Sequence, residues 1–189
     1  EYGTTDITRV VPVGHVTAEQ RRDFSLVLKG MIALSRLKFP RGTKSPLLDT
    51  IARAPIWAEY ADFGHGTGHG VGYFLNVHEG PQSISKAVPV PDMAMLPGMI
   101  TSIEPGLYRP GQWGIRIENL VLNVLVTPAV PDAEPGTPEY GRYLAFETPS
   151  LCPIDTDCID RSLLRDDEVQ WLNAYHAEVL RRLSPLVSG

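Results

Sequence analysis

The chain has 189 residues, of which 43% are hydrophobic and 21% are charged, proportions that are typical of a globular protein and favour one large domain over two small ones. Its formal net charge of -5 argues against a nucleic-acid partner, which normally requires a basic surface. Every apolar run is interrupted by proline, glycine or charge well short of a membrane span, so we expect neither a transmembrane helix nor a membrane partner.

The ends of the chain and its cysteines suggest where the protein works. The first six residues lack the basic start and apolar stretch of a signal peptide. Cys152 and Cys158 could pair, but such scarce cysteine is more typical of a reducing compartment, so we expect a cytoplasmic protein. The chain begins without methionine, directly at a strand-like segment, from which we expect a piece of a longer polypeptide.

Two elements are predicted before residue 40. Residues 4–13 are rich in apolar and β-branched residues, a pattern that predicts a strand. Thr17 and Gln20 have the spacing of a capping box, which marks the start of a helix. Apolar residues then recur at helical spacing, so we expect an amphipathic helix over residues 18–38 whose buried positions are Phe24, Val27, Leu28, Met31 and Leu34.

A second helix is predicted to open at Ser45, with the serine as its cap and Pro46 in its first turn. Leu48, Ile51 and Ala52 should face the core. Pro55 lies late in this helix and should kink or end it.

The middle of the chain predicts an antiparallel strand pair. Residues 100–104 and 113–122 both have strand character, and Pro-Gly dipeptides between them mark turns. Because the connection is short, we expect the two strands to pair in antiparallel fashion. Alternation predicts two same-face pairs, Ser102 with Glu104 and Arg116 with Glu118.

The remainder of the chain predicts a loop, a strand and a helix. Residues 127–141 are rich in proline, glutamate and glycine and are interpreted as an exposed loop. Residues 143–147 predict a strand. Three acidic residues from Asp166 suit the positive end of a last helix dipole. The buried side of that helix is expected to consist of Leu172, Tyr175, Val179, Leu180 and Leu183.

The most informative stretch is the run of histidines and glycines from His65 to Gly72, continued by Asn76–Pro81. Three of the five histidines of the chain fall between positions 65 and 78. Histidine is the commonest metal ligand and the usual proton carrier at neutral pH. Glycines clustered around it indicate that the backbone turns tightly or approaches another group closely.

Four residues have the character of metal ligands: Asp6, His69, Glu104 and Glu118. Asp6 lies inside a β-branched run, Glu104 ends a strand at a Pro-Gly turn, and Glu118 lies within a strand. A carboxylate buried in this way is costly unless it is paired or bound to metal. For any one of them the alternative is a solvated outer face of a strand.

The composition of this ligand set indicates the metal and the chemistry. Three carboxylates and one imidazole favour Mn, Co or Zn over a structural thiolate site. Because carboxylates can bridge, the set could hold two ions about 3.5–4 Å apart. Such a pair acidifies a shared water and polarises a substrate carbonyl, which indicates metal-assisted hydrolysis.

Five motifs in this order closely resemble the catalytic domain of the aminopeptidase P family, the Xaa-Pro aminopeptidases among the pita-bread metallopeptidases. The resemblance runs over essentially the whole chain, including a tail that resembles the C-terminal extension of the long cytosolic-type enzymes. It implies an α+β pita-bread fold, a curved and mainly antiparallel sheet with flanking helices. The motifs are Asp-Ile-Thr-Arg, His-Gly-Thr-Gly-His-Gly-Val-Gly, Val-His-Glu-Gly-Pro, Glu-Pro-Gly-Leu-Tyr and Gly-Ile-Arg-Ile-Glu-Asn.

The resemblance also implies roles for the ligands. Asp6 and Glu118 match the two carboxylates that bridge the metal ions. His69 and Glu104 match ligands of one of those ions, and Glu104 matches the position that also acts as general base on the bridging water. Two divalent ions are therefore expected, Mn before Zn or Co.

Four further residues match positions that handle the substrate. His65 and His78 match second-shell histidines that act on the substrate amide and its proton, so we expect them to be catalytic and substrate-binding. Tyr108 and Arg116 match residues near the proline-binding pocket and the metal centre.

One departure from the family pattern bears on activity. The family has another metal-binding aspartate about eleven residues before the Asp6 position, which would precede residue 1 here. We therefore expect residues 1–189 to be the C-terminal part of a pita-bread domain, with 143–189 as its strand and helix extension. The second metal site would be incomplete, so this chain by itself should bind metal weakly or singly and have little activity.

Three functions remain open at this point. The leading one is an Xaa-Pro aminopeptidase that acts on peptides with proline at the second position, with a homodimeric parent protein. The runner-up is a prolidase that cleaves Xaa-Pro dipeptides. A non-catalytic pita-bread module that binds peptides or proteins is the third, although such a module would be expected to have lost metal ligands.

Overall fold

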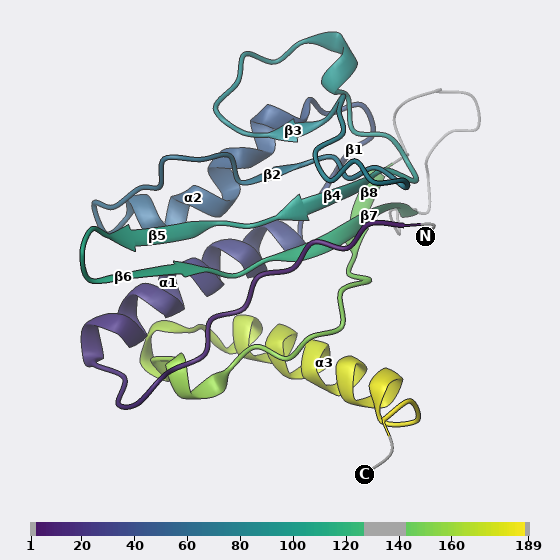
Figure 1. Ribbon diagram of the computed structural model, residues 1–189. Helices are drawn as coiled ribbons and strands as arrows, with labels where there is room; N and C mark the ends of the chain where they lie inside the picture. The colour runs from purple at the N-terminus through teal and green to yellow at the C-terminus, as the bar shows by residue number, and fades with distance from the viewer. Residues whose placement is uncertain (1–2, 127–142, 188–189) are drawn as a thin grey trace.

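A computed structural model describes residues 3–126 and 143–187. A curved antiparallel sheet lies over the long helix α1, with α2 beside α1 and α3 beneath it (Figure 1). The helices are α1 (Ala18–Ser35), α2 (Asp49–Trp57) and α3 (Asp166–Leu183), with short 3-10 turns η1 (Ser45–Leu48), η2 (Pro91–Met93), η3 (Thr156–Cys158) and η4 (Arg161–Leu163). The strands are β1 (Lys38–Pro40), β2 (Gly68–His69), β3 (Ser83–Ile84), β4 (Ile100–Ile103), β5 (Gly106–Arg109), β6 (Trp113–Arg116), β7 (Asn119–Val126) and β8 (Tyr143–Glu147).

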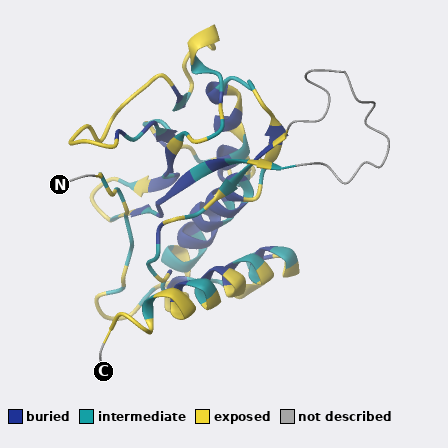
Figure 2. Ribbon diagram, turned by 90° about the vertical axis from the view of Figure 1, so that its right-hand side faces the viewer, coloured by how far each residue is buried: buried dark blue, intermediate teal, exposed yellow. Residues whose placement is uncertain are grey.

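Helix α1 is the centre of the core. The predicted capping box is confirmed, with the Thr17 side chain accepting from the Gln20 amide and the Gln20 side chain accepting from the Thr17 amide. All five predicted core positions of this helix are at most 1% exposed. Figure 2 shows α1 as the most continuously buried helix. The helix ends at Ser35 rather than at residue 38, because Lys38 already belongs to β1, which pairs with β8.

The second helix begins differently from the prediction. Ser45 does not cap it: the serine is the first residue of the 3-10 turn η1, and its hydroxyl accepts a hydrogen bond from the Ser83 amide at 2.9 Å. The α-helix proper begins at Asp49. Leu48 and Ala52 are buried in the core as expected, and Ile51 is partly buried against it. Pro55 lies in its last turn, and the helix ends at Trp57.

The central hairpin is longer and more divided than predicted. The predicted antiparallel pairing of the segments around 100–104 and 113–122 is confirmed by β4 with β7, but the second segment is two strands rather than one. Strand β5 was not predicted because it lies between the two Pro-Gly turn signals, and it pairs with β6. The main sheet has the order β1-β8-β7-β4, and the predicted strand at 143–147 is its member β8.

The predicted strand at residues 4–13 is absent. Within the described residues, this segment makes one hydrogen bond to another backbone, from the Glu118 amide to the Thr8 carbonyl at 3.1 Å. A strand needs a ladder of such bonds, and a single bond does not make one. It instead runs beside β6 and β7 (purple in Figure 1) before it enters α1.

The C-terminal part packs α3 against the rest of the domain. Leu172, Tyr175 and Val179 are buried as expected, whereas Leu180 is 69% exposed and lies on the outer face of the helix. The predicted loop at 127–141 lies outside the described residues. Cys152 and Cys158 are free thiols. Among the helices of the described ranges, none combines the length and apolar character needed to cross a bilayer.

Candidate metal centre

The four predicted ligands come together from four places in the chain. Asp6 lies in the N-terminal segment, His69 ends β2, Glu104 follows β4, and Glu118 lies between β6 and β7. The Nε2 atom of His69 is 3.2 Å from Glu104 Oε1 and 3.5 Å from Asp6 Oδ2. One ligand atom each from Asp6, His69 and Glu118 lie within 4.8 Å of one another, a spacing that suits a shared cation.

The hairpin places two of the carboxylates opposite each other. Ile103 pairs with Asn119 in the β4–β7 ladder, and Gly106 pairs with Arg116 in the β5–β6 ladder. The two ladders share one register, which sets Glu104 opposite Glu118. Pro105 has no amide hydrogen to donate, so the ladder is interrupted at this point. Two like charges in directly opposed positions are destabilising unless a cation lies between them.

Glu118 is the most buried of the four ligands, with 2% of the residue exposed. Its Oε2 accepts a 2.5 Å hydrogen bond from the Thr8 hydroxyl, whereas its Oε1 is buried and has no hydrogen-bond partner. Burial raises the pKa of Glu118 to about 7, and the neighbouring charges of Glu104 and Asp6 raise it as well. The hydrogen bond from Thr8 acts in the opposite direction and lowers this pKa. An orphaned buried carboxylate oxygen is the arrangement expected of a metal ligand.

His69 and Glu104 form a hydrogen-bonded pair beside Glu118. The hydrogen bond with Glu104 is the main cause that raises the pKa of His69. Burial alone would raise the pKa of Glu104, but hydrogen bonds from His69 and Ser102 outweigh it and lower that pKa. The Ser102 hydroxyl donates to Glu104 at 2.9 Å and accepts from the His69 amide at 2.9 Å, so the predicted same-face pair of Ser102 and Glu104 is confirmed.

This donor set fits a hard or borderline divalent cation. It offers carboxylate oxygens and one imidazole nitrogen, without a thiolate. A cation would satisfy the free Oε1 of Glu118 and offset the repulsion between Glu104 and Glu118. The residues that are present therefore fit the metal that the sequence predicts.

The residues predicted to handle substrate lie around this cluster. The imidazole rings of His69 and His78 meet edge to face, with centroids 4.2 Å apart, and His78 is exposed to solvent. His65 Nε2 is 2.6 Å from the Tyr108 hydroxyl. Arg116 donates from Nε to the Thr8 hydroxyl at 3.2 Å, so Arg116 and Glu118 both contact this hydroxyl. The structure thus brings all four of these residues to one region.

The glycines of the histidine stretch serve close approach rather than tight turning. Gly68 and Gly70 do not have positive φ angles. A Cβ on Gly68 would collide with the backbone carbonyl of Ser102, and one on Gly70 would collide with the carbonyl of Glu79. Because these side chains are missing, β2 can lie close to both β3 and β4. This close packing places His69 next to Glu104.

We expect Gly68→Ala to destabilise the protein by about 1–3 kcal/mol, because the new methyl group must push two backbones apart. Gly64→Ala is the matched control, since a Cβ at Gly64 meets nothing within 4 Å. Denaturant unfolding of both variants measures the difference. Equal stability of the two variants would contradict the close-approach explanation.

A buried ion pair supports the start of the histidine stretch. Arg53 is 1% exposed and donates to Asp49 at 2.6 Å, to the Phe63 carbonyl at 2.8 Å and to the His65 carbonyl at 2.6 Å. Asp49 also accepts a 2.6 Å hydrogen bond from the Thr67 hydroxyl. Two side chains of helix α2 therefore hold residues 63–67 in place through hydrogen bonds.

The raised pKa of Glu118 predicts how the stability of the metal-free protein changes with pH. Folded Glu118 keeps a proton between about pH 4.5 and 7 that the unfolded chain releases, so stability falls as the pH rises through this window. The loss specific to this residue is on the order of 3 kcal/mol. Urea unfolding with a chelator at pH 5 and pH 8 should show it, and Glu118→Gln should remove it. An unchanged pH dependence in that variant would contradict the assignment.

Sequence reasoning missed the residues that hold the ligands in place. Thr8 and Arg53 were given no role, although each makes buried hydrogen bonds within this region. A signal for Thr8 was present, because residues two apart in extended backbone share a face and Asp6 precedes it by two. Arg53 had no such signal, since an arginine on a helix is usually exposed.

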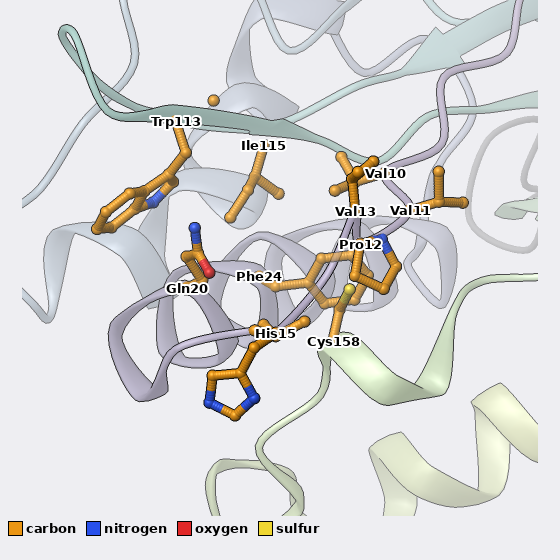
Figure 3. Close-up of a pocket in the computed structure, with 12 residues that line it drawn as sticks. Val10, Val11, Pro12, Val13, His15, Gln20, Phe24, Trp113, Ile115 and Cys158 are labelled. Atoms are coloured by element: carbon orange, nitrogen blue, oxygen red, sulfur yellow. The ribbon is translucent and has the colours of Figure 1, made fainter.

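A separate apolar cavity of about 300 Å³ lies between the N-terminal segment, α1 and β6 (Figure 3). Its walls include Val10, Val13, Phe24, Trp113 and Ile115. None of the four predicted ligands lines it, so it is distinct from the metal centre.

Comparison with known proteins identifies the family. A model of metallopeptidase family M24 matches residues 1–128, and a model of the C-terminal region of peptidase M24 matches residues 142–189. A probable Xaa-Pro aminopeptidase P of Coprinopsis cinerea is 46% identical over 187 residues, which make up 99% of this chain and 29% of that protein. Aminopeptidase P2 of Arabidopsis thaliana is 48% identical over 192 residues, covering 99% of this chain and 25% of that protein.

Solved structures agree with these matches. An X-prolyl aminopeptidase of Caenorhabditis elegans, described as a cytosolic enzyme with a di-nuclear active site, superposes with a TM-score of 0.86 at 41% identity, over 97% of this chain and 28% of that one. A prolidase of Pyrococcus furiosus has a TM-score of 0.56 at 37% identity, over 62% of this chain and 34% of that one. The chain spans less than a third of the length of these aminopeptidases. The expected α+β pita-bread fold is confirmed, and the chain belongs to metallopeptidase family M24.

Proposed function

We propose that the protein containing this chain is an Xaa-Pro aminopeptidase with a two-metal centre, which releases the N-terminal residue of peptides whose second residue is proline. The observation that carries the proposal is the opposed pair of Glu104 and Glu118 with His69 and Asp6 beside it, a donor set that suits a divalent cation. The similarity to aminopeptidase P over nearly the whole chain supports the substrate class.

The metal would be held by Asp6, His69, Glu104 and Glu118, and Mn is proposed before Zn or Co. Bound divalent ions would polarise the scissile carbonyl and lower the pKa of a water molecule. Asp6 and Glu118 are proposed as bridging ligands, which agrees with the free oxygen of Glu118. The di-nuclear site described for the Caenorhabditis elegans relative supports two ions.

The surrounding residues are proposed to move protons and orient the peptide. Glu104, whose lowered pKa keeps it ionised at neutral pH, accepts a proton from the attacking water. His78, in contact with His69 and open to solvent, donates a hydrogen bond to the substrate. His65 and Tyr108, which are 2.6 Å apart, are proposed to contact the proline and its leaving nitrogen, and Arg116 contacts the Thr8 hydroxyl that binds Glu118.

Prolidase remains the second candidate because it shares the metal-centre motifs. The Pyrococcus furiosus prolidase aligns with 62% of this chain, whereas the Caenorhabditis elegans aminopeptidase aligns with 97%, including the C-terminal region. The match to curated aminopeptidases over 99% of this chain also favours the aminopeptidase. The presence of all four ligands that fall within this chain argues against a non-catalytic binding module.

The substrate test uses the full-length gene product, loaded with Mn²⁺, and two peptides that differ in length. We expect cleavage of an Xaa-Pro-Xaa tripeptide and little cleavage of the matching Xaa-Pro dipeptide. An Xaa-Ala-Xaa tripeptide is the control for the proline requirement. Preference for the dipeptide would assign a prolidase, and no hydrolysis of any of the three would contradict a peptidase function.

The cellular compartment is proposed on separate grounds. Both cysteines are free thiols, and the Caenorhabditis elegans relative is described as cytosolic. We therefore place the protein in the cytoplasm. Fractionation of cells that express a tagged full-length protein checks this, and recovery in the secreted fraction would contradict it.

A further inference from the structure

One arginine of the sequence motifs has no role in the proposed chemistry. Arg9 closes the Asp-Ile-Thr-Arg motif, three residues after the ligand Asp6. All three nitrogens of its guanidinium group donate hydrogen bonds to protein acceptors. The acceptors are Cys152 O and Pro153 O for Nε, Thr8 O and Glu118 O for Nη1, and Asn119 Oδ1, Cys152 O and Tyr175 Oη for Nη2.

These acceptors come from separate parts of the fold. Glu118 immediately precedes β7, and Asn119 is the first residue of that strand. Cys152 and Pro153 lie in the segment after β8, and Tyr175 lies on α3. The bond from Nη1 to the Glu118 carbonyl is 2.5 Å long and that to the Thr8 carbonyl is 2.9 Å. Arg9 therefore holds the backbone next to one ligand, Asp6, against the backbone of another, Glu118.

Tyr175 fixes the other side of the guanidinium group. The residue is 7% exposed, and the ring of Trp171 stacks on its ring with centroids 5.4 Å apart. Its hydroxyl accepts from Arg9 Nη2 at 2.9 Å and lies 2.8 Å from the Cys152 carbonyl, to which it can donate. The hydroxyl also lies 3.4 Å from Asn119 Oδ1. A single hydroxyl on α3 thus contacts the arginine and two of its acceptors.

We propose that Arg9 is a positioning residue that sets the separation of Asp6 and Glu118, and that Tyr175 on α3 holds Arg9 in place. The C-terminal region thereby supports the metal centre without contacting the metal. The planar fork of arginine can serve acceptors in several directions at once, which a lysine ammonium cannot do with the same geometry. The inference rests on the proposed function only in taking Asp6 and Glu118 as metal ligands.

The test compares metal affinity with stability in the full-length gene product. The variants are Arg9→Lys, which keeps the charge, and Tyr175→Phe, which removes one oxygen atom from a residue that does not touch the ligands. The control is Arg36→Met, which breaks the exposed ion pair from Arg36 to Asp167 on the same helix α3. Calorimetric titration with Mn²⁺ gives affinity and stoichiometry, and thermal unfolding with a chelator gives stability.

We expect Arg9→Lys to weaken Mn²⁺ binding by about 10–100-fold and Tyr175→Phe to weaken it in the same direction by a smaller factor, with the control unchanged. Activity, where present, should fall through kcat with little change in KM. The inference is overturned if both variants lose thermal stability while their Mn²⁺ affinity stays within about twofold of wild type.

The same titration separates this inference from the proposed function. Mn²⁺ binding by the wild type with no Xaa-Pro hydrolysis would refute the peptidase proposal, while the affinities of the variants would still decide the role of Arg9. Absence of Mn²⁺ binding by the wild type would refute both.

Discussion

Replacing Glu118 with glutamine is expected to abolish metal-dependent activity and to weaken Mn²⁺ binding by more than about 100-fold, beyond the loss typical of residues that only support a ligand. Glutamine keeps the shape and the Thr8 contact but removes the charge that the metal requires. The same change should leave the metal-free protein more stable than the wild type at pH 8, because Glu118 ionises there in a buried site beside Glu104 and Asp6.

These two opposite effects make the prediction specific. Replacing a residue with a purely structural role would lower the stability of the protein. Replacing a metal ligand that is held in an unfavourable buried site should instead raise the stability of the metal-free protein while it weakens metal binding. Glu147→Gln is the matched control, since Glu147 is an exposed carboxylate at the end of β8. Calorimetry and chelator-treated unfolding measure both quantities. Tight Mn²⁺ binding by Glu118→Gln would contradict the assignment.

Replacing Arg53 with methionine is expected to destabilise the protein by about 3–5 kcal/mol, because it leaves the Asp49 carboxylate buried without its cation. The guanidinium group also lies 3.8 Å above the Phe63 ring and binds the His65 carbonyl, so the histidine stretch loses its support as well. Denaturant unfolding of the metal-free protein measures the loss.

A double variant tests the reason for this effect. Asp49→Asn combined with Arg53→Met removes both charges, so it should be less destabilised than the sum of the two single variants. Arg22→Met is the control, because Arg22 pairs with Glu59 at the surface and such pairs contribute at most about 1 kcal/mol. A loss below about 1 kcal/mol for Arg53→Met would contradict the role given to the buried pair.

The helix signals in the sequence predicted local structure well where the chain itself supplies the partners. The capping box of Thr17 and Gln20 and the core face of α1 are both local patterns, and both are confirmed. The strand at residues 4–13 failed because a strand is defined by its neighbour, and none of the described strands pairs with this segment. The serine cap failed because Ser45 binds the distant Ser83 amide.

The cluster of proposed metal ligands was predictable because its members break the local rules. Asp6 and Glu118 are carboxylates among strand-like or β-branched residues. This conflict between a charged side chain and its apolar surroundings is visible in the sequence itself. The register that opposes Glu104 to Glu118, and the gap that Pro105 makes in the ladder, depend on pairing across the hairpin. The supports of the site, Arg9 and Arg53, act through tertiary contacts and could not be read from spacing.

The most direct test of the proposed metal centre is anomalous diffraction from crystals of the full-length gene product soaked with Mn²⁺. We predict anomalous density enclosed by Asp6, His69, Glu104 and Glu118, within about 2.0–2.3 Å of their ligand atoms, the usual coordination distances for small divalent ions. Manganese density elsewhere in the protein, in crystals of an enzyme that Mn²⁺ activates, would contradict the assignment of this site.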